Sequence, residues 1–137
     1  MPLEEAPEQG RNGFPKYNKK ILIVDDDETV LYLLRRFFAR EQFEVMVARG
    51  GLEAKERLKT QRPDVVLTDL KMPSFSGVDL IGFIHQNMKN IPIIVMTAYP
   101  YLYPKKKGEN EVTAYFVKPF DVNEIFTSVK RILGGRV

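Results

Sequence analysis

The 137-residue sequence contains no cysteine, only one histidine and no long apolar run. The absence of cysteine excludes disulfide bonds and every catalytic or zinc site that depends on a thiolate. No apolar stretch approaches the ~20 residues of a membrane-spanning helix, and the N-terminus lacks the apolar core of a secretory signal. The net charge of +3 is too small to indicate a nucleic-acid-binding surface. These absences predict a single cytoplasmic domain with no direct contact to a membrane or to nucleic acid.

The chain divides into a short leader and one regular domain. Residues 1–18 are rich in proline, glutamate, glycine and asparagine and lack apolar periodicity, so we expect a flexible leader. Residues 19–135 alternate between short apolar runs and amphipathic segments. The expected strands are 20–25, 43–47, 64–69, 91–97 and 114–118. The expected helices are 28–40, 52–59, 80–88 and a last one that opens with a capping box formed by Asp121 and Glu124.

Nearly continuous apolar strands alternating with helices are typical of a parallel sheet that is covered on both faces. With right-handed connections, we expect a doubly wound α/β fold of five strands in the flavodoxin-like order 2-1-3-4-5. In this order the first and third strands are neighbours. The residues that follow the strands then line one crevice at the carboxyl edge of the sheet, where open α/β sheets bind their ligands.

Charged residues follow three of the strands at this edge. Asp25 and Asp26 end the first strand, Asp69 ends the third and Lys118 ends the fifth. Carboxylates within roughly 5 Å of one another repel by about 3 kcal/mol per pair at an effective dielectric of 20, so such a site is unfavourable when empty. Mg²⁺ fits it best, because this ion takes oxygen ligands and commonly bridges a carboxylate to a phosphoryl oxygen.

An aspartate can itself accept a phosphoryl group as an acyl phosphate, and the transfer needs mainly in-line positioning and charge neutralisation. We expect Asp69 to be the acceptor, because it stands alone at the centre of the crevice. Asp25 and Asp26 are then expected to hold the metal. Lys118 would supply positive charge, and the hydroxyl of Thr97 would donate a hydrogen bond to a phosphoryl oxygen.

Four motifs occur in order and carry a resemblance to a known family: Val24-Asp25-Asp26, Asp69-Leu70-Lys71-Met72-Pro73 with Gly77, Thr97-Ala98, and Tyr115 through Lys118-Pro119-Phe120. Over residues 19–135 the chain resembles the receiver domain of two-component response regulators. The resemblance implies a phosphoacceptor signalling domain that assists only its own phosphorylation and dephosphorylation, not an enzyme. It also implies that the phosphoryl group comes from a histidine kinase or a histidine phosphotransfer protein.

The resemblance further implies how the acidic site works. Asp25, Asp26, Asp69 and the backbone carbonyl of Lys71 would bind Mg²⁺, and Asp69 would become phosphorylated. Lys118 would bind a phosphoryl oxygen, and its bond to the following proline is typically cis in the family.

Other positions are implied to control the signal. Thr97 and Tyr115 would reorient on phosphorylation and pass the change to the far face of the domain. Lys71 and Tyr99, each two residues beyond a site residue, would influence how easily water reaches the acyl phosphate. We expect the bulky Tyr99 to slow self-dephosphorylation.

Residues 99–111 depart from the family pattern, which normally has a helix between the fourth and fifth strands. Pro100 and Pro104, without an apolar stripe, argue against a stable helix, so we expect an atypical or disrupted fourth helix. This helix belongs to the usual dimerisation surface, so a homodimer and the downstream effector are left open. Only four residues follow the last expected helix, so we expect no output domain in this chain.

Other interpretations stay open at this point. Residues 25–29 also resemble the D-x-D-x-T opening of haloacid-dehalogenase-type phosphatases, with Asp25 as nucleophile and Asp27 as acid/base. The chain lacks a later strand ending in an acidic pair and has no room for a cap domain, and both points oppose a phosphatase. A receiver-like docking module that is not phosphorylated is a further possibility, which the complete acidic site opposes. Taken alone, the acidic run could also be a solvated turn and helix cap.

Overall fold

Short apolar runs form one five-stranded parallel sheet in the computed structural model, which describes residues 19–99 and 112–134. The strands are β1 (Lys20–Val24), β2 (Glu44–Ala48), β3 (Val65–Thr68), β4 (Ile93–Thr97) and β5 (Ala114–Val117). Their order is β2-β1-β3-β4-β5, with every neighbouring pair parallel. This topology confirms the doubly wound α/β fold with flavodoxin-like strand order. Every residue of β4 is buried, as expected for a strand that is covered on both faces.

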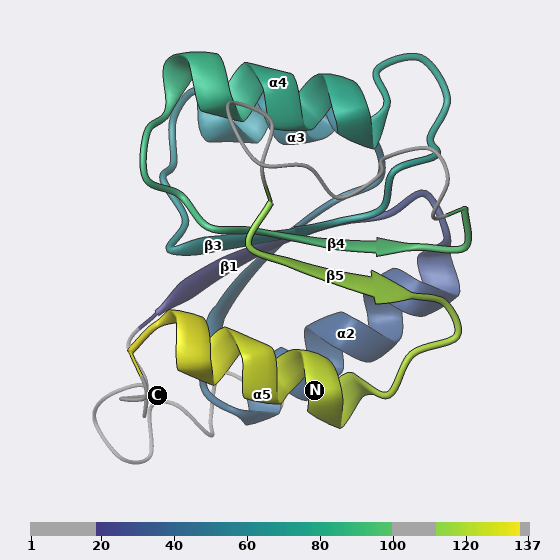
Figure 1. Cartoon of the computed structure of the whole chain (residues 1–137), viewed down its shortest axis with the longest axis vertical. Helices are drawn as coiled ribbons and strands as arrows, with labels where there is room; N and C mark the ends of the chain where they lie inside the picture. Colours follow the sequence, from purple (N-terminus) through teal and green to yellow (C-terminus); the bar gives the residue numbers. More distant parts are fainter. Residues whose placement is uncertain (1–18, 100–111, 135–137) are drawn as a thin grey trace, which may run out of the picture.

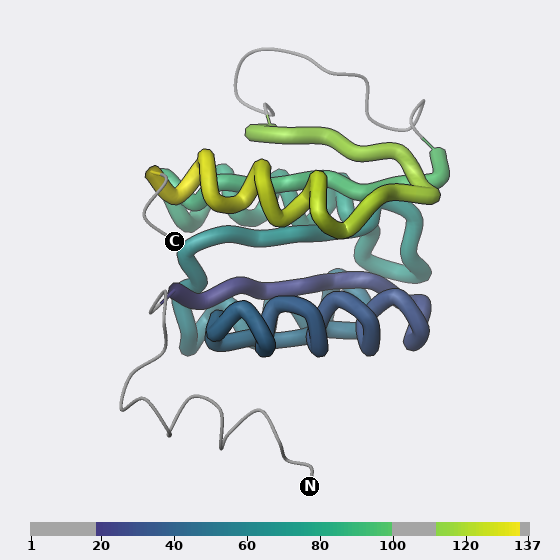
Figure 2. The backbone as a smooth tube through the Cα atoms, turned by 90° about the horizontal axis from the view of Figure 1, so that it is seen from below, coloured from purple at the N-terminus to yellow at the C-terminus, as the bar shows by residue number. Residues whose placement is uncertain are grey.

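Helices cover both faces of this sheet. They are α2 (Glu28–Arg40), α3 (Gly51–Leu58), α4 (Gly77–Asn87) and α5 (Val122–Ile132). Figure 1 shows α3 and α4 on one face and α2 and α5 on the other. Figure 2, seen from the second face, shows α2 and α5 running along the strands. Within the described ranges, no helix is long and apolar enough to cross a membrane.

Each face of the sheet has its own apolar core. Under α3 and α4 the strands contact residues such as Ala54 and Ile81, which are fully buried. Under α2 and α5 the core is aromatic: Phe38 meets Phe43 edge-on, with ring centroids 5.3 Å apart. Such aromatic pairs contribute about 0.5–1.5 kcal/mol beyond their buried area. The two cores fix the helices that begin at the carboxyl edge of the sheet.

The start of α2 follows directly from an acidic residue. The Oδ1 atom of Asp27 accepts hydrogen bonds from the amides of Thr29 at 2.9 Å and Val30 at 3.4 Å. These bonds satisfy donors that a helix N-terminus otherwise leaves unpaired. One of the three consecutive aspartates therefore has a structural role.

The other helix starts differ from the expected ones. Asp121 caps α5, but its carboxylate accepts from the amide of Asn123, whereas the amide of Glu124 donates to the Asp121 carbonyl. The predicted capping box at these residues is therefore wrong. A capping box occurs instead between Ser76 and Asp79, so α4 begins three residues before the expected start.

The leader, residues 1–18, lies outside the described residues. So does the segment 100–111, which carries most of the expected atypical or disrupted fourth helix.

Candidate functional site

The carboxyl ends of β1 and β3 place two aspartates side by side. Val24 pairs with Thr68, and the amide of Asp69 donates to the Val24 carbonyl at 2.9 Å. Asp25 follows β1 and is fully buried, while Asp69 follows β3 and is only 6% exposed. Oxygen atoms of these two carboxylates and of Asp26 all lie within 4.8 Å of one another. The sheet register thus assembles the acidic cluster that the sequence predicts.

Lys118 reaches this cluster from β5. Its amide donates to the carbonyl of Thr97 at 2.7 Å, which continues the ladder beyond the strand. Its Nζ donates to Oδ2 of Asp25 at 2.8 Å and to Oδ2 of Asp69 at 3.4 Å. The peptide bond between Lys118 and Pro119 is cis, as the resemblance implies. One ammonium group is therefore shared by two carboxylates from neighbouring strands.

Burial and hydrogen bonding shift the pKa values of this pair in opposite directions. Burial raises the pKa of Asp25, and the hydrogen bond from Lys118 only partly offsets this rise. Burial also lowers the pKa of Lys118, but the hydrogen bond and charge of Asp25, with those of Asp69, outweigh it and leave that pKa raised. Lys118 is therefore charged at neutral pH, and its ammonium lies against the buried carboxylate of Asp25.

These groups line a pocket of about 460 Å³ at the edge of the sheet. Its lining consists of Asp25, Asp26, Asp27, Asp69, Lys71, Met72, Pro73, Ala98, Tyr99 and Lys118. The metal-binding donors of this set are oxygen atoms, and three carboxylates lie close enough to share one ion. This is the donor chemistry that Mg²⁺ takes in proteins, so the residues present fit that ion.

Lys71 and Tyr99 meet at the rim of the pocket. The Nζ of Lys71 lies 4.6 Å from the centroid of the Tyr99 ring, within the range of a cation–π contact. Tyr99 remains 37% exposed. The two positions that the sequence analysis links to phosphoryl lifetime therefore contact each other.

Thr97 and Tyr115 do not belong to the pocket lining. Thr97 is fully buried, and its Oγ1 accepts a hydrogen bond of 2.9 Å from the amide of Tyr99. Tyr115 pairs with Val95 in the sheet and packs, half-buried, against the core under α3 and α4. Desolvation raises the pKa of its phenol. The pocket unites the predicted acidic residues with Lys118, whereas the predicted switch residues do not line it.

Two glycines near the pocket are in positions that the sequence analysis leaves without a role. A Cβ atom on Gly77 would lie 2.0 Å from the carbonyl oxygen of Asp69. A Cβ atom on Gly51 would lie 2.1 Å from the carbonyl oxygen of Phe75. Both glycines stand at the first residue of a helix, but only the folded chain shows which backbone each one meets.

Comparison with known proteins agrees with this geometry. A family model described as response regulator receiver domain matches residues 21–130. The chain belongs to the response regulator receiver family. Over 117 residues it is 38% identical to the sporulation initiation phosphotransferase F of Bacillus subtilis, covering 85% of this chain and 94% of that protein. It is also 34% identical to the transcriptional regulatory protein PhoP of the same organism, but spans only 49% of PhoP.

Solved structures give the same result. The receiver resembles TrrA from Thermotoga maritima in complex with Mg²⁺–BeF, with a TM-score of 0.75, 32% identity and coverage of 83% of this chain and 98% of TrrA. It also resembles a chain in the complex of the histidine kinase ThkA with TrrA, with a TM-score of 0.74, 32% identity and coverage of 85% and 99%.

Family membership argues against the phosphatase interpretation left open by the sequence. Receivers are signalling domains that carry a phosphorylated aspartate and bind Mg²⁺ in an acidic pocket. The phosphatase interpretation is not favoured, and the carboxylate it needs as acid/base, that of Asp27, caps α2 instead.

Proposed function

We propose that this receiver accepts a phosphoryl group on Asp69 from a histidine kinase or a histidine phosphotransfer protein. The observation that carries the proposal is the 3.4 Å contact between Lys118 Nζ and Asp69 Oδ2 inside the acidic cluster. The other oxygen, Oδ1, accepts a 2.7 Å hydrogen bond from the Leu70 amide, which fixes the orientation of the carboxylate. The Oδ1 atom is thus held by the backbone amide of Leu70, and the Oδ2 atom faces the Lys118 ammonium.

The transfer is a displacement at phosphorus. A carboxylate oxygen of Asp69 forms the new bond to phosphorus, while the bond from phosphorus to the partner's imidazole nitrogen breaks. The imidazole leaves with the electron pair. Such a transfer requires alignment and charge neutralisation more than covalent chemistry from the protein. Lys118 stands within reach of the oxygens that carry the charge.

The metal site belongs to the same proposal. Asp25, Asp26, Asp69 and the backbone carbonyl of Lys71 would hold Mg²⁺, which when bound neutralises charge on the phosphoryl oxygens. The close approach of the three carboxylates supports this assignment.

The signal would pass through Thr97 and Tyr115. In the structure the Thr97 oxygen accepts a hydrogen bond from the Tyr99 amide. A phosphoryl group on Asp69 offers the Thr97 hydroxyl a charged acceptor, and bonds to charged groups are stronger than neutral ones. We expect Thr97 to turn toward the pocket and Tyr115 to repack in the space behind it.

Tyr99 would set the lifetime of the phosphoryl group. Its ring stands at the rim and is covered on one side by the Lys71 ammonium. A ring held in this way narrows the approach of water to the acyl phosphate of Asp69. Tyr99→Ala should therefore shorten the lifetime, and a variant that dephosphorylates no faster than the wild type would refute this role.

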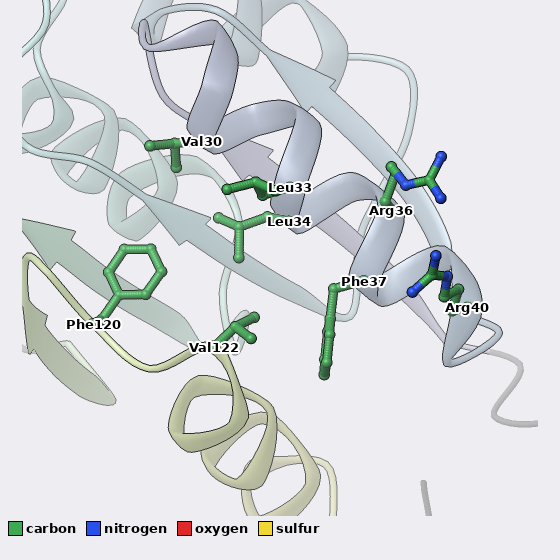
Figure 3. A pocket seen from close by; sticks show the side chains of 8 residues that line it. All are labelled: Val30, Leu33, Leu34, Arg36, Phe37, Arg40, Phe120 and Val122. Atoms are coloured by element: carbon green, nitrogen blue, oxygen red, sulfur yellow. The ribbon is translucent and has the colours of Figure 1, made fainter.

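An apolar groove lined by residues of α2, Phe120 and Val122 suits the phosphoryl-donating partner. It has a volume of about 520 Å³ and is lined by Val30, Leu33, Leu34, Arg36, Phe37, Arg40, Phe120 and Val122. Figure 3 shows the apolar side chains of α2, of Phe120 and of Val122 at the start of α5 around it, with the two arginines at the end far from Phe120. Leu33 is 60% exposed although it is apolar.

Phe120, which lines the groove, follows Lys118 of the acidic site by two residues in the chain. We infer that an amphipathic helix of the histidine-bearing partner occupies the groove, with acidic residues toward Arg36 and Arg40. Leu33→Asp should slow transfer from any kinase that phosphorylates the wild type, but leave the rate with acetyl phosphate unchanged. Equal loss with both donors would contradict this docking mode.

The remaining proposals concern the whole molecule. We infer that residues 19–135 form the complete receiver unit, that it acts in the cytoplasm, and that it assists only its own phosphorylation and dephosphorylation.

Intact-mass analysis with Mg²⁺ and acetyl phosphate tests the proposed function. The wild type should gain one phosphoryl group, and Asp69→Asn should gain none. Asp121→Asn is the matched control, because this exposed residue caps α5 and asparagine caps equally well. A wild type that gains nothing, or an Asp69→Asn variant that still gains mass, would contradict the proposal.

A further inference from the structure

The N-terminus of α3 touches the loop between β3 and α4 through bare backbone. A Cβ atom on Gly51 would lie 2.1 Å from the carbonyl oxygen of Phe75 and 2.9 Å from its Cδ2 atom. The first of these atoms is backbone, which cannot turn aside as the end of a flexible side chain can. Any residue larger than glycine at position 51 would therefore push the loop away.

A second contact between α3 and this loop involves the aromatic ring of Phe75. The Nζ of Lys55, one turn after Gly51, lies 5.2 Å from the centroid of the Phe75 ring and 5.3 Å from that of Phe83. Both distances are within the range of cation–π attraction. Because Lys55 belongs to α3 and Phe83 to α4, the Lys55 ammonium connects the loop to both helices.

The loop is also fixed close to the acidic site. Leu70 and Met72 are buried in the core under α3 and α4. The amide of Gly77 donates to the Leu70 carbonyl at 2.8 Å, which closes the loop at its base. Between these points Ser74 has a φ of 64°, a conformation that persists in a residue other than glycine only where the surroundings hold it. The contact of Gly51 with Phe75 lies next to this strained residue.

We propose that Gly51 is a positioning residue for the metal site. It touches neither the carboxylates nor the ion, but sets the place of the loop that carries the Lys71 carbonyl. With Phe75 seated on Gly51 and its ring under Lys55, that carbonyl is held at a fixed place relative to Asp69. The proposal rests on the proposed function, because it assumes that the Lys71 carbonyl is a metal ligand.

Calorimetric titration of the unphosphorylated protein with Mg²⁺ tests the proposal. Gly51→Ala should weaken Mg²⁺ binding by about 10-fold or more, the usual effect of disturbing groups that orient metal ligands. Gly82→Ala is the matched control: this glycine is also helical, but nothing lies within 4 Å of its added Cβ, so Mg²⁺ affinity should not change. A folded Gly51→Ala protein with wild-type Mg²⁺ affinity would overturn the proposal.

A second pair of variants tests the positioning of the loop without adding atoms at position 51. Phe75→Leu and Phe83→Leu each remove one ring from the Lys55 ammonium, but only Phe75 belongs to the loop that carries the Lys71 carbonyl. Phe75→Leu should weaken Mg²⁺ binding and Phe83→Leu should not. Equal Mg²⁺ affinities in the two variants would show that loop position does not depend on this contact and would overturn the proposal.

Different results would refute the proposed function and the positioning role of Gly51. If the wild type neither binds Mg²⁺ nor gains a phosphoryl group, the proposed function fails. If the wild type does both and Gly51→Ala matches it in Mg²⁺ affinity, the positioning role alone fails. Thermal unfolding of each variant in the absence of Mg²⁺ separates loss of ion binding from loss of fold.

Discussion

Lys118 donates a 2.8 Å hydrogen bond to a carboxylate oxygen of Asp25, a residue that solvent does not reach. The two residues are 93 positions apart in the chain, and the pair joins the last strand of the sheet to the first. Because the same ammonium contacts Asp69, it occupies the acidic cluster that the family uses for Mg²⁺. We therefore expect lysine and metal to compete for carboxylate charge in the unphosphorylated protein.

Replacing this lysine should separate metal binding from phosphorylation. In Lys118→Met, Mg²⁺ should bind about tenfold more tightly, since one positive charge near a divalent ion is removed. Stability without Mg²⁺ should fall by about 2 kcal/mol, because a hydrogen bond to a buried carboxylate is lost, and added Mg²⁺ should restore it. Despite this tighter Mg²⁺ binding, Lys118→Met should react with acetyl phosphate more slowly than the wild type. Titration calorimetry and urea unfolding measure these effects.

Lys130→Met is the control for this experiment. It removes the same charge from the last turn of α5, where the ammonium lies over the Phe126 ring. Mg²⁺ affinity and phosphorylation should both remain at wild-type values. Weaker Mg²⁺ binding in Lys118→Met would contradict the competition between lysine and metal.

Asp27 should prove structural rather than chemical. Asp27→Ala should lower stability by about 1 kcal/mol, because the capping bonds to the start of α2 are lost, whereas Asp27→Asn should change it little. Both variants should still take up a phosphoryl group from acetyl phosphate. Loss of phosphoryl chemistry in Asp27→Asn would revive the phosphatase interpretation, which needs this carboxylate as acid/base.

Two glycines of the same helix should respond in opposite directions to alanine. Gly82→Ala should stabilise the protein by about 1 kcal/mol, because this residue lies inside α4 with open space around it. Gly77→Ala should destabilise it, since the new Cβ would meet the Asp69 carbonyl oxygen at 2.0 Å. Chemical denaturation of the two variants measures both changes, and a destabilised Gly82→Ala protein would be inconsistent with the structure.

The phenol of Tyr115 should lose its proton at a higher pH than that of a free tyrosine. Desolvation raises the pKa of its phenol above the ordinary value of 10.0. The stabilising contribution of the neutral phenol is complete below pH 10 and is lost as the pH rises through the raised pKa. The ultraviolet absorbance of tyrosinate, compared between the wild type and Tyr115→Phe, should show a late step only in the wild type. A step at the ordinary pKa would be evidence against the desolvated phenol.

Local signals in the sequence accounted for much of the fold. The bounds of α2 are as expected, because Asp27 and the apolar spacing that follows act within a few residues. β4 begins at Ile93 rather than residue 91, and Pro92 before it takes part in the ladder only through its carbonyl, which accepts from Val66. The start of α4 was missed because Ser76 and Gly77 precede the first apolar stripe and resemble a turn.

The site was predictable where topology alone decides it. Residues at the ends of neighbouring strands must lie close together, so the acidic cluster followed from strand order. Contacts that depend on side-chain direction were beyond sequence reasoning: the Lys118 ammonium on Asp25, and the hydroxyl of Thr97 turned away to the Tyr99 amide. The contact of Gly51 with Phe75 joins two separate βα units, so no local pattern reveals it.

The most direct test of the central claim locates the phosphoryl group within the chain. After reaction with acetyl phosphate and Mg²⁺, borohydride reduces an aspartyl phosphate to homoserine, and peptide mass spectrometry finds the altered residue. Homoserine is expected at Asp69 and at no other aspartate. Homoserine at Asp25 or Asp26 would contradict the assignment of acceptor and metal ligands and would favour a phosphatase-like nucleophile.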